Sequence, residues 1–482
     1  ECLPVHARRG AWSYRAGRFV LRHRIAVGVA TVANLAMVAG LTFAAYQAYE
    51  ANRERERAER HFANVRQLAN VFIFDVYAAI DTLPGSVDAR KLMIQTALDY
   101  LERLSAERRS DLSLQIEIAR AYGRIGDILG GPNRPSLEDK KGAHRARSKV
   151  KALLKPVLDS TGSTSPAHRL AQNEMAKVLN REASAIMFDG RAKEAVALLH
   201  QALPHAEAVT TLEPRALPTV LSNLALAHSA ACDDAGYERY HQKTWQAWQE
   251  LLAKQPADTD ALMGLVYYHN QRAFHLLGRD ASPDTARLAA QAARLTLQTV
   301  ASLRGKAPDN AEIALHEALA HGHLGFALGR TGHWSQAAEE LQSALALTRS
   351  EIQREPRNIL LQTALAEMEV KLSQARLALH RTDDSVALAR AAVRRYEALQ
   401  DDVRNEKYTL NWTAQANYAL GQALLRRSAT STASSAAADG REACDRYGRA
   451  AKLLEAAERK EPNCAGVLST ETVRQAMRKC SP

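Results

Sequence analysis

Short proline-containing segments of similar composition recur along this chain at nearly regular intervals. They read EPRA at 213–216, QPADTD at 255–260, APDNAE at 307–312, EPRNI at 355–359 and EPNCA at 461–465. The first four prolines are 42, 52 and 48 residues apart, and a proline-free boundary, DVRNE at 402–406, continues the series. Such a period is typical of stacked supersecondary units, each of which buries its apolar face against its neighbours. The sequence therefore predicts a repeat array rather than the three globular domains that 482 residues would otherwise suggest.

The units between these boundaries have the composition of helical hairpins. The chain contains only 15 prolines, and alanine, the strongest helix former, is abundant. The clearest unit follows the tetratricopeptide spacing at Leu324, Gly325, Leu328, Gly332, Ala337, Leu341 and Ala344. A second copy has Leu420, Gly421, Leu424, Ala443, Tyr447 and Ala450. It is interrupted at 428–440 by small and polar residues that predict a flexible loop. We predict an all-α fold in which residues 111–482 form an α-solenoid of about seven tetratricopeptide-like hairpins.

No charged residue occurs between Ile25 and Ala48, a stretch that reads IAVGVATVANLAMVAGLTFAAYQA. As a helix this stretch would be about 36 Å long, enough to cross a hydrocarbon core of roughly 30 Å. Two alternatives are a cleaved signal peptide, whose apolar region usually has about 7–15 residues, and a buried helix of a soluble protein. The length of the stretch favours a single transmembrane helix at 25–48.

The positive charge of the chain is concentrated before this apolar stretch. The whole chain carries 64 Lys and Arg against 53 Asp and Glu, a net charge of +11. Residues 1–24 have six arginines and one acid, a net +5, so the other 458 residues carry 58 basic and 52 acidic side chains, a net +6. A nucleic-acid-binding cluster is the alternative, but the adjacent apolar stretch favours a topology signal. The positive-inside rule places residues 1–24 in the cytoplasm and the repeats outside it, in a single-pass protein of the inner membrane. We expect lipid around residues 15–48 and no nucleic acid as a partner.

A helical stalk and hairpin are predicted between the membrane and the repeats, over residues 49–110. Acidic and basic side chains alternate in YEANRERERAER at 49–60, which is typical of a solvated helix. LPGS at 83–86 then interrupts an apolar pattern of helical spacing, and a second amphipathic run follows from 88 to 104. A homodimeric coiled coil through this stalk is an open alternative.

The chain lacks the motifs that carry catalysis in common enzyme classes. No phosphate-binding glycine loop, metalloprotease motif, nucleophile elbow or kinase signature occurs in it. His316, His321, His323 and His333 lie close in sequence but have no obvious thiolate or carboxylate co-ligands, so we interpret them as packing or groove-lining side chains rather than metal ligands. Four tryptophans are interpreted as core: Trp245, Trp248, Trp334 and Trp412. The residues predict no catalytic site, cofactor or metal.

Five cysteines in a chain of this length do not form a disulfide framework. With the repeats outside the cytoplasm, however, a single disulfide is compatible with an oxidising compartment. We predict that Cys464 pairs with Cys480 or with Cys444, and the sequence does not choose between them.

The inner face of a helical-repeat array is the expected site for a protein or peptide ligand, because the first helix of each unit lines the concave side. The candidate binding residues in the best-defined units are Phe326, Arg330, Tyr418, Gln422 and Arg426. The alternative is that they are ordinary surface residues.

The N-terminal part of the chain resembles the transmembrane and repeat half of bacterial receptor-type Ser/Thr protein kinases. The resemblance rests on Leu3-Pro4-Val5-His6-Ala7-Arg8, Tyr14-Arg15, Phe19 to His23, Val65-Arg66, Leu68-Ala69, Phe72, Leu83-Pro84-Gly85-Ser86, Ala89-Arg90, Ala97-Leu98 and Tyr100-Leu101. It is specific through residue 122 and includes Gly126-Asp127, but beyond residue 166 only the general repeat character continues.

This resemblance implies a kinase domain on the cytoplasmic side, before the membrane helix, and extracytoplasmic repeats that sense a partner. The chain begins with Glu1 rather than Met, so we expect the catalytic domain, which these residues lack, to precede it in a longer gene product. The chain would then be the sensor half of a Ser/Thr kinase. The alternative function is a kinase-independent scaffold that assembles envelope complexes.

Overall fold

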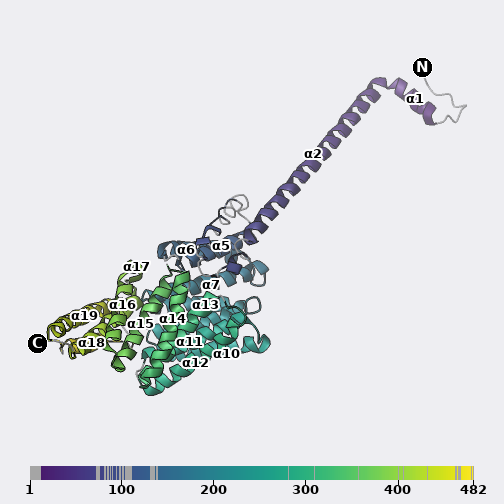
Figure 1. Cartoon of the computed structure of the whole chain (residues 1–482). Helices are drawn as coiled ribbons and strands as arrows, with labels where there is room; N and C mark the ends of the chain where they lie inside the picture. Colours follow the sequence, from purple (N-terminus) through teal and green to yellow (C-terminus); the bar gives the residue numbers. More distant parts are fainter. Residues whose placement is uncertain are drawn as a thin grey trace. The chain divides into compact units, whose positions relative to one another are not determined.

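The computed structural model describes residues 12–71, 111–130, 139–279, 282–308, 310–356, 358–399, 401–404, 406–430, 433–461 and 468–478, with scattered positions from 76 to 103 and residues 136, 464 and 480. The chain divides into two compact units, Glu1–Leu68 and Ala69–Pro482. The described residues are helical or in turns, and no strand occurs among them (Figure 1). The predicted all-α class is confirmed.

The N-terminal unit consists of helix α1, Trp12–Arg22, and most of the long helix α2, Arg24–Asn70. Within α2, the segment Arg24–Arg60 is long and apolar enough to cross a membrane by length and composition. The polar side chains in it bond to their own helix: Thr31 Oγ1 donates to the Val27 carbonyl and Asn34 Nδ2 to the Ala30 carbonyl, both at 2.8 Å. These bonds satisfy the polar side chains within the helix itself, as a helix in an apolar environment would require.

The charged segment after the apolar stretch continues α2 without a break. Arg57 and Glu54 form an ion pair at 2.6 Å, and Arg55 and Glu59 lie 3.5 Å apart. All four side chains are exposed, so each pair adds only a few tenths of a kcal/mol. The short helix α3, Tyr77–Ile80, follows. Pro84 and Gly85 of the LPGS turn and about half of the second run of the predicted hairpin lie outside the described residues.

The second unit is a stack of helical hairpins. Its helices are α5 (Leu112–Gly130), α6 (Lys140–Ser160), α7 (Pro166–Phe188), α8 (Ala192–Ala208), α9 (Ala216–Ala230), α10 (Asp234–Lys254), α11 (Thr259–Arg279), α12 (Pro283–Arg304), α13 (Ala311–Arg330), α14 (Trp334–Arg354), α15 (Ile359–Ala378), α16 (Thr382–Glu397), α17 (Asp401–Arg404), α18 (Lys407–Ser428), α19 (Ala433–Lys460) and α20 (Thr470–Arg478). Each first helix packs on the second helix of its own hairpin, from α5 with α6 to α18 with α19. In the described part of the chain this gives seven hairpins, as predicted.

The recurring proline-containing segments precede the first helix of a hairpin. Asn310, in APDNAE, is the N-cap of α13 and accepts hydrogen bonds from the backbone N–H groups of Glu312 and Ile313. Asn358, in EPRNI, caps α15 by accepting from the N–H of Leu361. A cap of this kind stabilises a helix by about 1 kcal/mol. These segments therefore end one hairpin and begin the next.

Small residues allow the two helices of a hairpin to approach closely. A Cβ on Gly325 of α13 would lie 2.7 Å from Leu341 Cγ and 2.9 Å from the Ala337 carbonyl oxygen of α14. A Cβ on Gly421 of α18 would lie 2.7 Å from the ring of Tyr447 in α19. The tetratricopeptide positions recognised in the sequence are therefore the contact points of the hairpins.

The predicted loop at 428–440 is wrong for residues 433–440, because α18 ends at Ser428 but α19 already begins at Ala433. Alanines at 436–438 favour a helix over a loop. Arg427 at the end of α18 also donates two hydrogen bonds of 2.8 Å to the carboxylate of Asp439, which is buried. This bidentate ion pair fixes the start of α19 against α18.

Candidate functional site

The first helices of the hairpins form an inner layer. The helices α5, α7, α9, α11, α13, α15 and α18 pack on one another in succession as well as on their hairpin partners, whereas the described second helices make their main contacts with sequence neighbours. In a curved stack, the helices that approach one another more closely line the concave side. We call the side of these seven first helices that faces away from the second helices the inner wall.

The inner wall is half-buried rather than open. Neither α13 nor α15 has an exposed residue, and in α18 the only exposed side chain within the helix is Arg426. The second helices, by contrast, each have a row of exposed positions. Any ligand on the inner wall would therefore contact side chains that the protein already holds in fixed positions.

Polar contacts connect successive first helices along this wall. They are Arg120 Nε to Glu174 at 3.1 Å, Arg181 Nε to Asp127 at 2.9 Å, Asn223 Nδ2 to Asn180 Oδ1 at 2.9 Å, Ser222 Oγ to Gln271 Oε1 at 2.8 Å and Asn270 Nδ2 to His316 Nδ1 at 3.1 Å. We call this series the polar ladder. Polar groups placed between packed helices must be paired, so the ladder fixes each hairpin relative to the next.

Burial alone would raise the pKa of the Glu174 carboxyl, but Lys177 and Arg120 beside it bring its pKa below the ordinary value. The contact between Arg120 and Glu174, the first of the polar ladder along the chain, is therefore an ion pair. The Asp127 carboxylate is also buried and lies next to Arg181. Charges at these positions are fixed inside the array, and they are not displayed on its surface.

The structure gives the five predicted binding residues different surroundings. Phe326 is half-buried on α13, with the Arg330 guanidinium 4.7 Å and the Lys371 ammonium of α15 5.2 Å from its ring centroid. Tyr418 is also half-buried, but its ring lies 5.5 Å from that of Tyr447 and packs against the core of α18, α19 and α20. Burial raises the pKa of Tyr418.

Gln422 is half-buried and Arg426 is exposed, both on α18. Because α15 lies between α13 and α18, the two predicted groups occupy separate parts of the inner wall. The sequence prediction also missed Lys371 of the neighbouring first helix, whose ammonium lies near the Phe326 ring and pairs with Glu367 at 2.6 Å.

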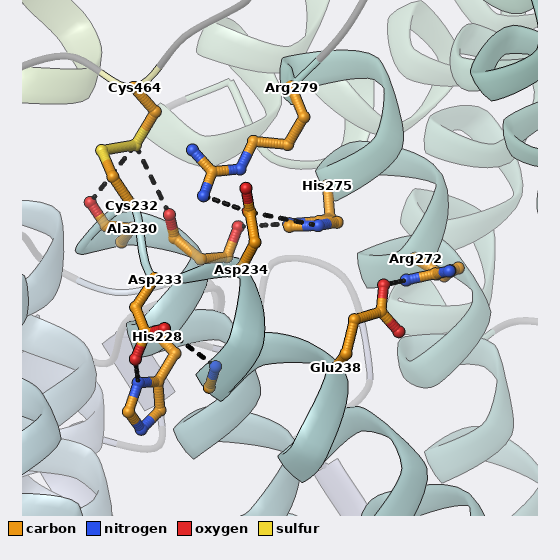
Figure 2. Close-up of polar contacts among 12 residues, drawn as sticks. His228, Ala230, Cys232, Asp233, Asp234, Glu238, Arg272, His275, Arg279 and Cys464 are labelled. Carbon is orange, nitrogen blue, oxygen red and sulfur yellow. Dashed lines mark hydrogen bonds and ion pairs between the residues drawn. A yellow bond between two sulfur atoms is a disulfide. The ribbon is translucent and has the colours of Figure 1, made fainter.

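A disulfide joins two distant parts of the array. Cys232 and Cys464 are bonded with an S–S distance of 2.09 Å across 232 residues of sequence (Figure 2). Cys232 lies in the turn between α9 and α10 with a φ of 62°, and Cys464 follows α19. The predicted pairing of Cys464 with Cys480 or Cys444 is therefore wrong, because the chain after α19 returns to the third hairpin.

Cys444 and Cys480 are free thiols that lie near each other. The Cys444 Sγ is 3.5 Å from the Cys480 carbonyl oxygen. Burial raises the pKa of the Cys480 thiol to about 12, and the neighbouring Cys444 adds to the shift. These two cysteines lie where the end of the chain meets α19, beside the apolar contacts of Val473 and Met477 with that helix.

Other contacts also join the last hairpin of the array to an early one. The N–H of Ala192, at the start of α8, donates to Glu461 at 3.1 Å, and Lys460 pairs with Asp189 at 3.0 Å. The rings of Phe188 and Tyr408 are 5.5 Å apart. Residues from the α7–α8 turn therefore meet the start of α18 and the end of α19, which lie more than 200 positions later. We call these contacts and the disulfide the closure.

The α9–α10 turn next to the disulfide contains a group of charges (Figure 2). Asp233 caps α10 by accepting from the Gly236 N–H at 2.9 Å and also lies 2.8 Å from His228 Nδ1. The Gly236 bond and then His228 lower the pKa of the Asp233 carboxyl. Asp234 pairs with Arg279 of α11, and Glu238 pairs with Arg272 two turns earlier in that helix. The turn that carries Cys232 is therefore also fixed to the fourth hairpin.

Stacked histidine and tyrosine rings fill the interface between α10 and α11. The centroids of Tyr237 and His275 are 3.5 Å apart, and those of His241 and Tyr268 are 4.1 Å apart, both in parallel stacks. His269 completes the set and meets the Tyr268 ring edge-on at 5.1 Å. We call these five residues the histidine seam.

The histidines of the seam are buried and neutral. Burial, together with a smaller effect of Arg272, lowers the pKa of His241 to about 3. Burial likewise lowers the pKa of His269 and His275 to about 4, and Arg279 contributes to the shift of His275.

The indole of Trp245 packs against the seam, tilted on the Tyr268 ring at a centroid distance of 5.4 Å, and Trp245 is 37% exposed. Trp245 is thus not the core residue predicted, whereas Trp248 is buried.

Of the four histidines of the fifth hairpin, His316 and His323 are buried packing residues, whereas His333 is exposed and lies 3.0 Å from the Thr331 hydroxyl. The His316 ring meets Tyr267 edge-on at 4.2 Å, and burial lowers its pKa to about 4. His323 is buried near Phe274, and His321 pairs with Glu340 at 2.6 Å. Within the described residues, no group of three His, Cys, Asp or Glu side chains is arranged to hold a metal ion.

Sequence reasoning missed the partner of Cys464 and the histidine seam. The disulfide has no local signature, because it joins segments 232 residues apart, whereas the seam depends on ring contacts between two successive helices, α10 and α11. The available signal for the seam was the row of Tyr and His in YYHNQRAFH at 267–275, whose polar and aromatic side chains occupy a helix with no exposed residue over that stretch.

No protein-family model and no curated protein sequence matches this chain. Solved structures that align with it include a signal-transduction ATPase with a tetratricopeptide-repeat sensor from Pyrococcus horikoshii, at 14% identity and a TM-score of 0.40, which covers 81% of this chain and 52% of that one. This chain thus spans about half the length of that protein. Human IFIT1, solved as a dimer with m7Gppp-AAAA, aligns at 14% identity and a TM-score of 0.36 over 84% of each chain. Yeast Tom70 aligns at 12% identity and a TM-score of 0.20 over 88% of this chain and 95% of that one.

Proposed function

We propose that this protein is a membrane-anchored, extracytoplasmic repeat module that binds a protein or peptide. The observation that carries the proposal is the Cys232–Cys464 disulfide in a chain with an apolar helix at 24–60. Disulfides persist mainly in oxidising compartments. Together with the net +5 of residues 1–24, this supports a cytoplasmic N-terminus and repeats on the opposite side of the inner membrane.

The binding surface in this proposal is the inner wall around Phe326. The Arg330 guanidinium and the Lys371 ammonium lie 4.7 Å and 5.2 Å from its ring centroid, and Lys371 also pairs with Glu367 at 2.6 Å. Such a surface suits a peptide that offers apolar and acidic side chains together. Gln422 and Arg426 would contact another part of the same ligand, because α18 continues the inner wall beyond α15.

We further propose that the module is the sensor half of a Ser/Thr protein kinase whose catalytic domain lies outside this chain. The support is the resemblance at residues 3–122, with a juxtamembrane segment at 1–24, a membrane helix at 25–48 and a stalk at 49–110, through which a homodimer would form. The alternative is a kinase-independent envelope scaffold. The upstream genomic sequence separates the two, because a kinase core in frame before Glu1 supports the first and an initiator codon directly before Glu1 supports the second.

Thiol labelling in intact cells and spheroplasts tests the topology. The variant used keeps only Cys232 and Cys464, with the other three cysteines replaced. A membrane-impermeant maleimide is added before and after reduction, and labelling of Cys232 is measured. We expect that the maleimide does not label Cys232 before reduction, because the disulfide protects it, and that it labels Cys232 from the periplasmic side after reduction. A Cys232 that is reduced in cells and reached only after lysis would contradict the proposed compartment.

Site-specific photo-crosslinking tests the binding surface. A photoreactive amino acid replaces Phe326 on the inner wall, and the matched control replaces Leu288, which is 51% exposed on the outer helix α12. We expect a discrete adduct from position 326 that Arg330→Glu and Lys371→Glu together abolish. Equal adducts from both positions, or none from 326, would argue against a ligand on the inner wall.

A further inference from the structure

Helix α1, Trp12–Arg22, has two chemically distinct faces. Trp12, Ala16, Phe19 and Val20 are spaced by four, three and one residues, which places them on one side of a helix. Arg15, Arg18 and Arg22 share the adjacent side. The large apolar side chains are strongly exposed, with Trp12 at 86% and Phe19 at 60%.

No residue of α1 is buried in the protein. The contacts of its apolar side are local: the Phe19 ring lies 4.9 Å from that of His23, the residue at which α1 ends and α2 begins. An exposed apolar face beside a row of arginines is typical of helices that lie at a membrane surface. Directly after His23, the apolar segment of α2 starts, and its large side chains are exposed in the same way.

We propose that α1 is an interfacial helix that lies in the head-group layer of the membrane and binds anionic phospholipids. Trp12 and Phe19 would enter the boundary between head groups and acyl chains, where aromatic rings are favoured. The three arginines flank that side closely enough for their aliphatic stems to lie along the surface while the guanidinium groups reach phosphate. This inference rests on the proposed membrane anchor and adds a lipid preference to it.

Charge complementarity and chain continuity both favour lipid as the occupant. Arg15, Arg18, Arg22 and Arg24 are not offset by any acidic residue between 12 and 49, so this end of the helix carries a concentrated positive charge. A cytoplasmic protein domain that covers the same apolar side is the competing occupant, and it becomes an outcome of the test. Each arginine near an anionic surface is expected to change lipid binding about fivefold.

The test uses the full chain in nanodiscs of phosphatidylcholine alone and of phosphatidylcholine mixed with phosphatidylglycerol. Brominated lipids quench tryptophan at the level of the head-group boundary, and the difference between the wild type and Trp12→Phe isolates the signal of Trp12. We expect quenching of Trp12 that increases with phosphatidylglycerol. If Trp12→Phe leaves the quenching unchanged in both lipids, α1 does not lie in the interface and the proposal is overturned.

Lipid selectivity is measured as the ratio of phosphatidylglycerol to phosphatidylcholine retained on the chain during purification. We expect the triple variant Arg15→Gln, Arg18→Gln and Arg22→Gln to lower this ratio at least about fivefold. The matched control, Arg53→Gln, Arg55→Gln and Arg57→Gln in the stalk, should leave it unchanged. Equal losses in both variants, or none in the first, overturn the lipid preference, whereas a chain that never enters nanodiscs overturns the membrane anchor as well.

Discussion

At the scale of single residues, each hairpin depends on positions where one atom more would not fit. Gly325 lies against Leu341 and the Ala337 backbone at distances that leave no room for a Cβ. Gly440, inside α19, has no atom within 4 Å of the position that its Cβ would take. The two glycines share a helical conformation and differ in the space around them.

We therefore predict opposite effects of the same substitution at these two sites. Gly325→Ala forces α13 and α14 apart and lowers the free energy of unfolding by about 1–3 kcal/mol. Gly440→Ala raises it by about 0.5–1 kcal/mol, because alanine is the better helix former. Denaturant midpoints of the full chain in detergent measure both changes. A Gly325→Ala protein as stable as the wild type would show that the hairpin relaxes without cost.

A second residue-scale prediction concerns the ion pair between the half-buried Arg181 and the buried Asp127 in the polar ladder. Arg181→Met leaves the Asp127 carboxylate buried without its nearest cation, and we expect a loss of about 3–5 kcal/mol. Adding Asp127→Leu removes the uncompensated charge, so the double variant should recover most of that loss. Equilibrium denaturation of the two variants measures the difference. A double variant less stable than Arg181→Met alone would contradict an electrostatic role for the pair.

At the scale of helices, the α10–α11 interface is held by rings that must remain uncharged. The seam histidines have pKa values of about 3 to 4 in the folded protein, against about 6.5 in an unfolded chain. The unfolded state binds more protons below pH 6.5, so folding stability is lost as the pH falls from 6.5 towards 4. The charged groups that face His275 are Arg272, Arg279 and Asp234, and the two cations oppose its protonation more than the acid favours it.

We predict that the array becomes less stable at pH 5 than at pH 7.5, by about 2 kcal/mol for each fully buried histidine. His275→Asn should weaken the pH dependence of the melting temperature, because one coupled protonation is removed. The control is His380→Asn, at an exposed position whose φ of 59° suits asparagine. Calorimetry of the full chain at several pH values measures the slope. An equal change of slope in both variants would contradict the assignment to the seam.

The helices themselves were predictable, because the signals for them are local. The caps at Asn310 and Asn358 and the small residues at Gly325 and Ala337 appear in the sequence in the order in which the structure uses them. The start of α19 was mispredicted, because the serines and threonines at 428–435 outweighed the alanines at 436–438 and the ion pair between Arg427 and Asp439 is not visible in the sequence. The binding residues were placed by repeat register alone, and register does not distinguish Phe326, with cations on its ring, from Tyr418, which packs on Tyr447.

At the scale of the repeat array, the sequence indicated the units but not the closure. Lys407, Lys460 and Glu461 contact the α7–α8 turn because the superhelix brings its last units back to its second hairpin. No periodicity in the chain encodes that return, which accumulates from small rotations between neighbouring hairpins. Gly190, with a φ of 85°, leaves the room that Lys407 occupies at this contact.

The closure leads to the last prediction, that the Cys232–Cys464 bond limits how far the array opens. Cys232→Ser with Cys464→Ser frees a loop of 232 residues, for which the loss of stability is about 3–5 kcal/mol. The polar contacts at Ala192 and Lys460 remain, so we expect the folded array to persist with a larger radius of gyration in solution scattering. The matched control is Cys444→Ser with Cys480→Ser, which removes two free thiols and should leave the radius unchanged. If both double variants scatter like the wild type, the polar contacts alone close the array, and the disulfide serves only its stability.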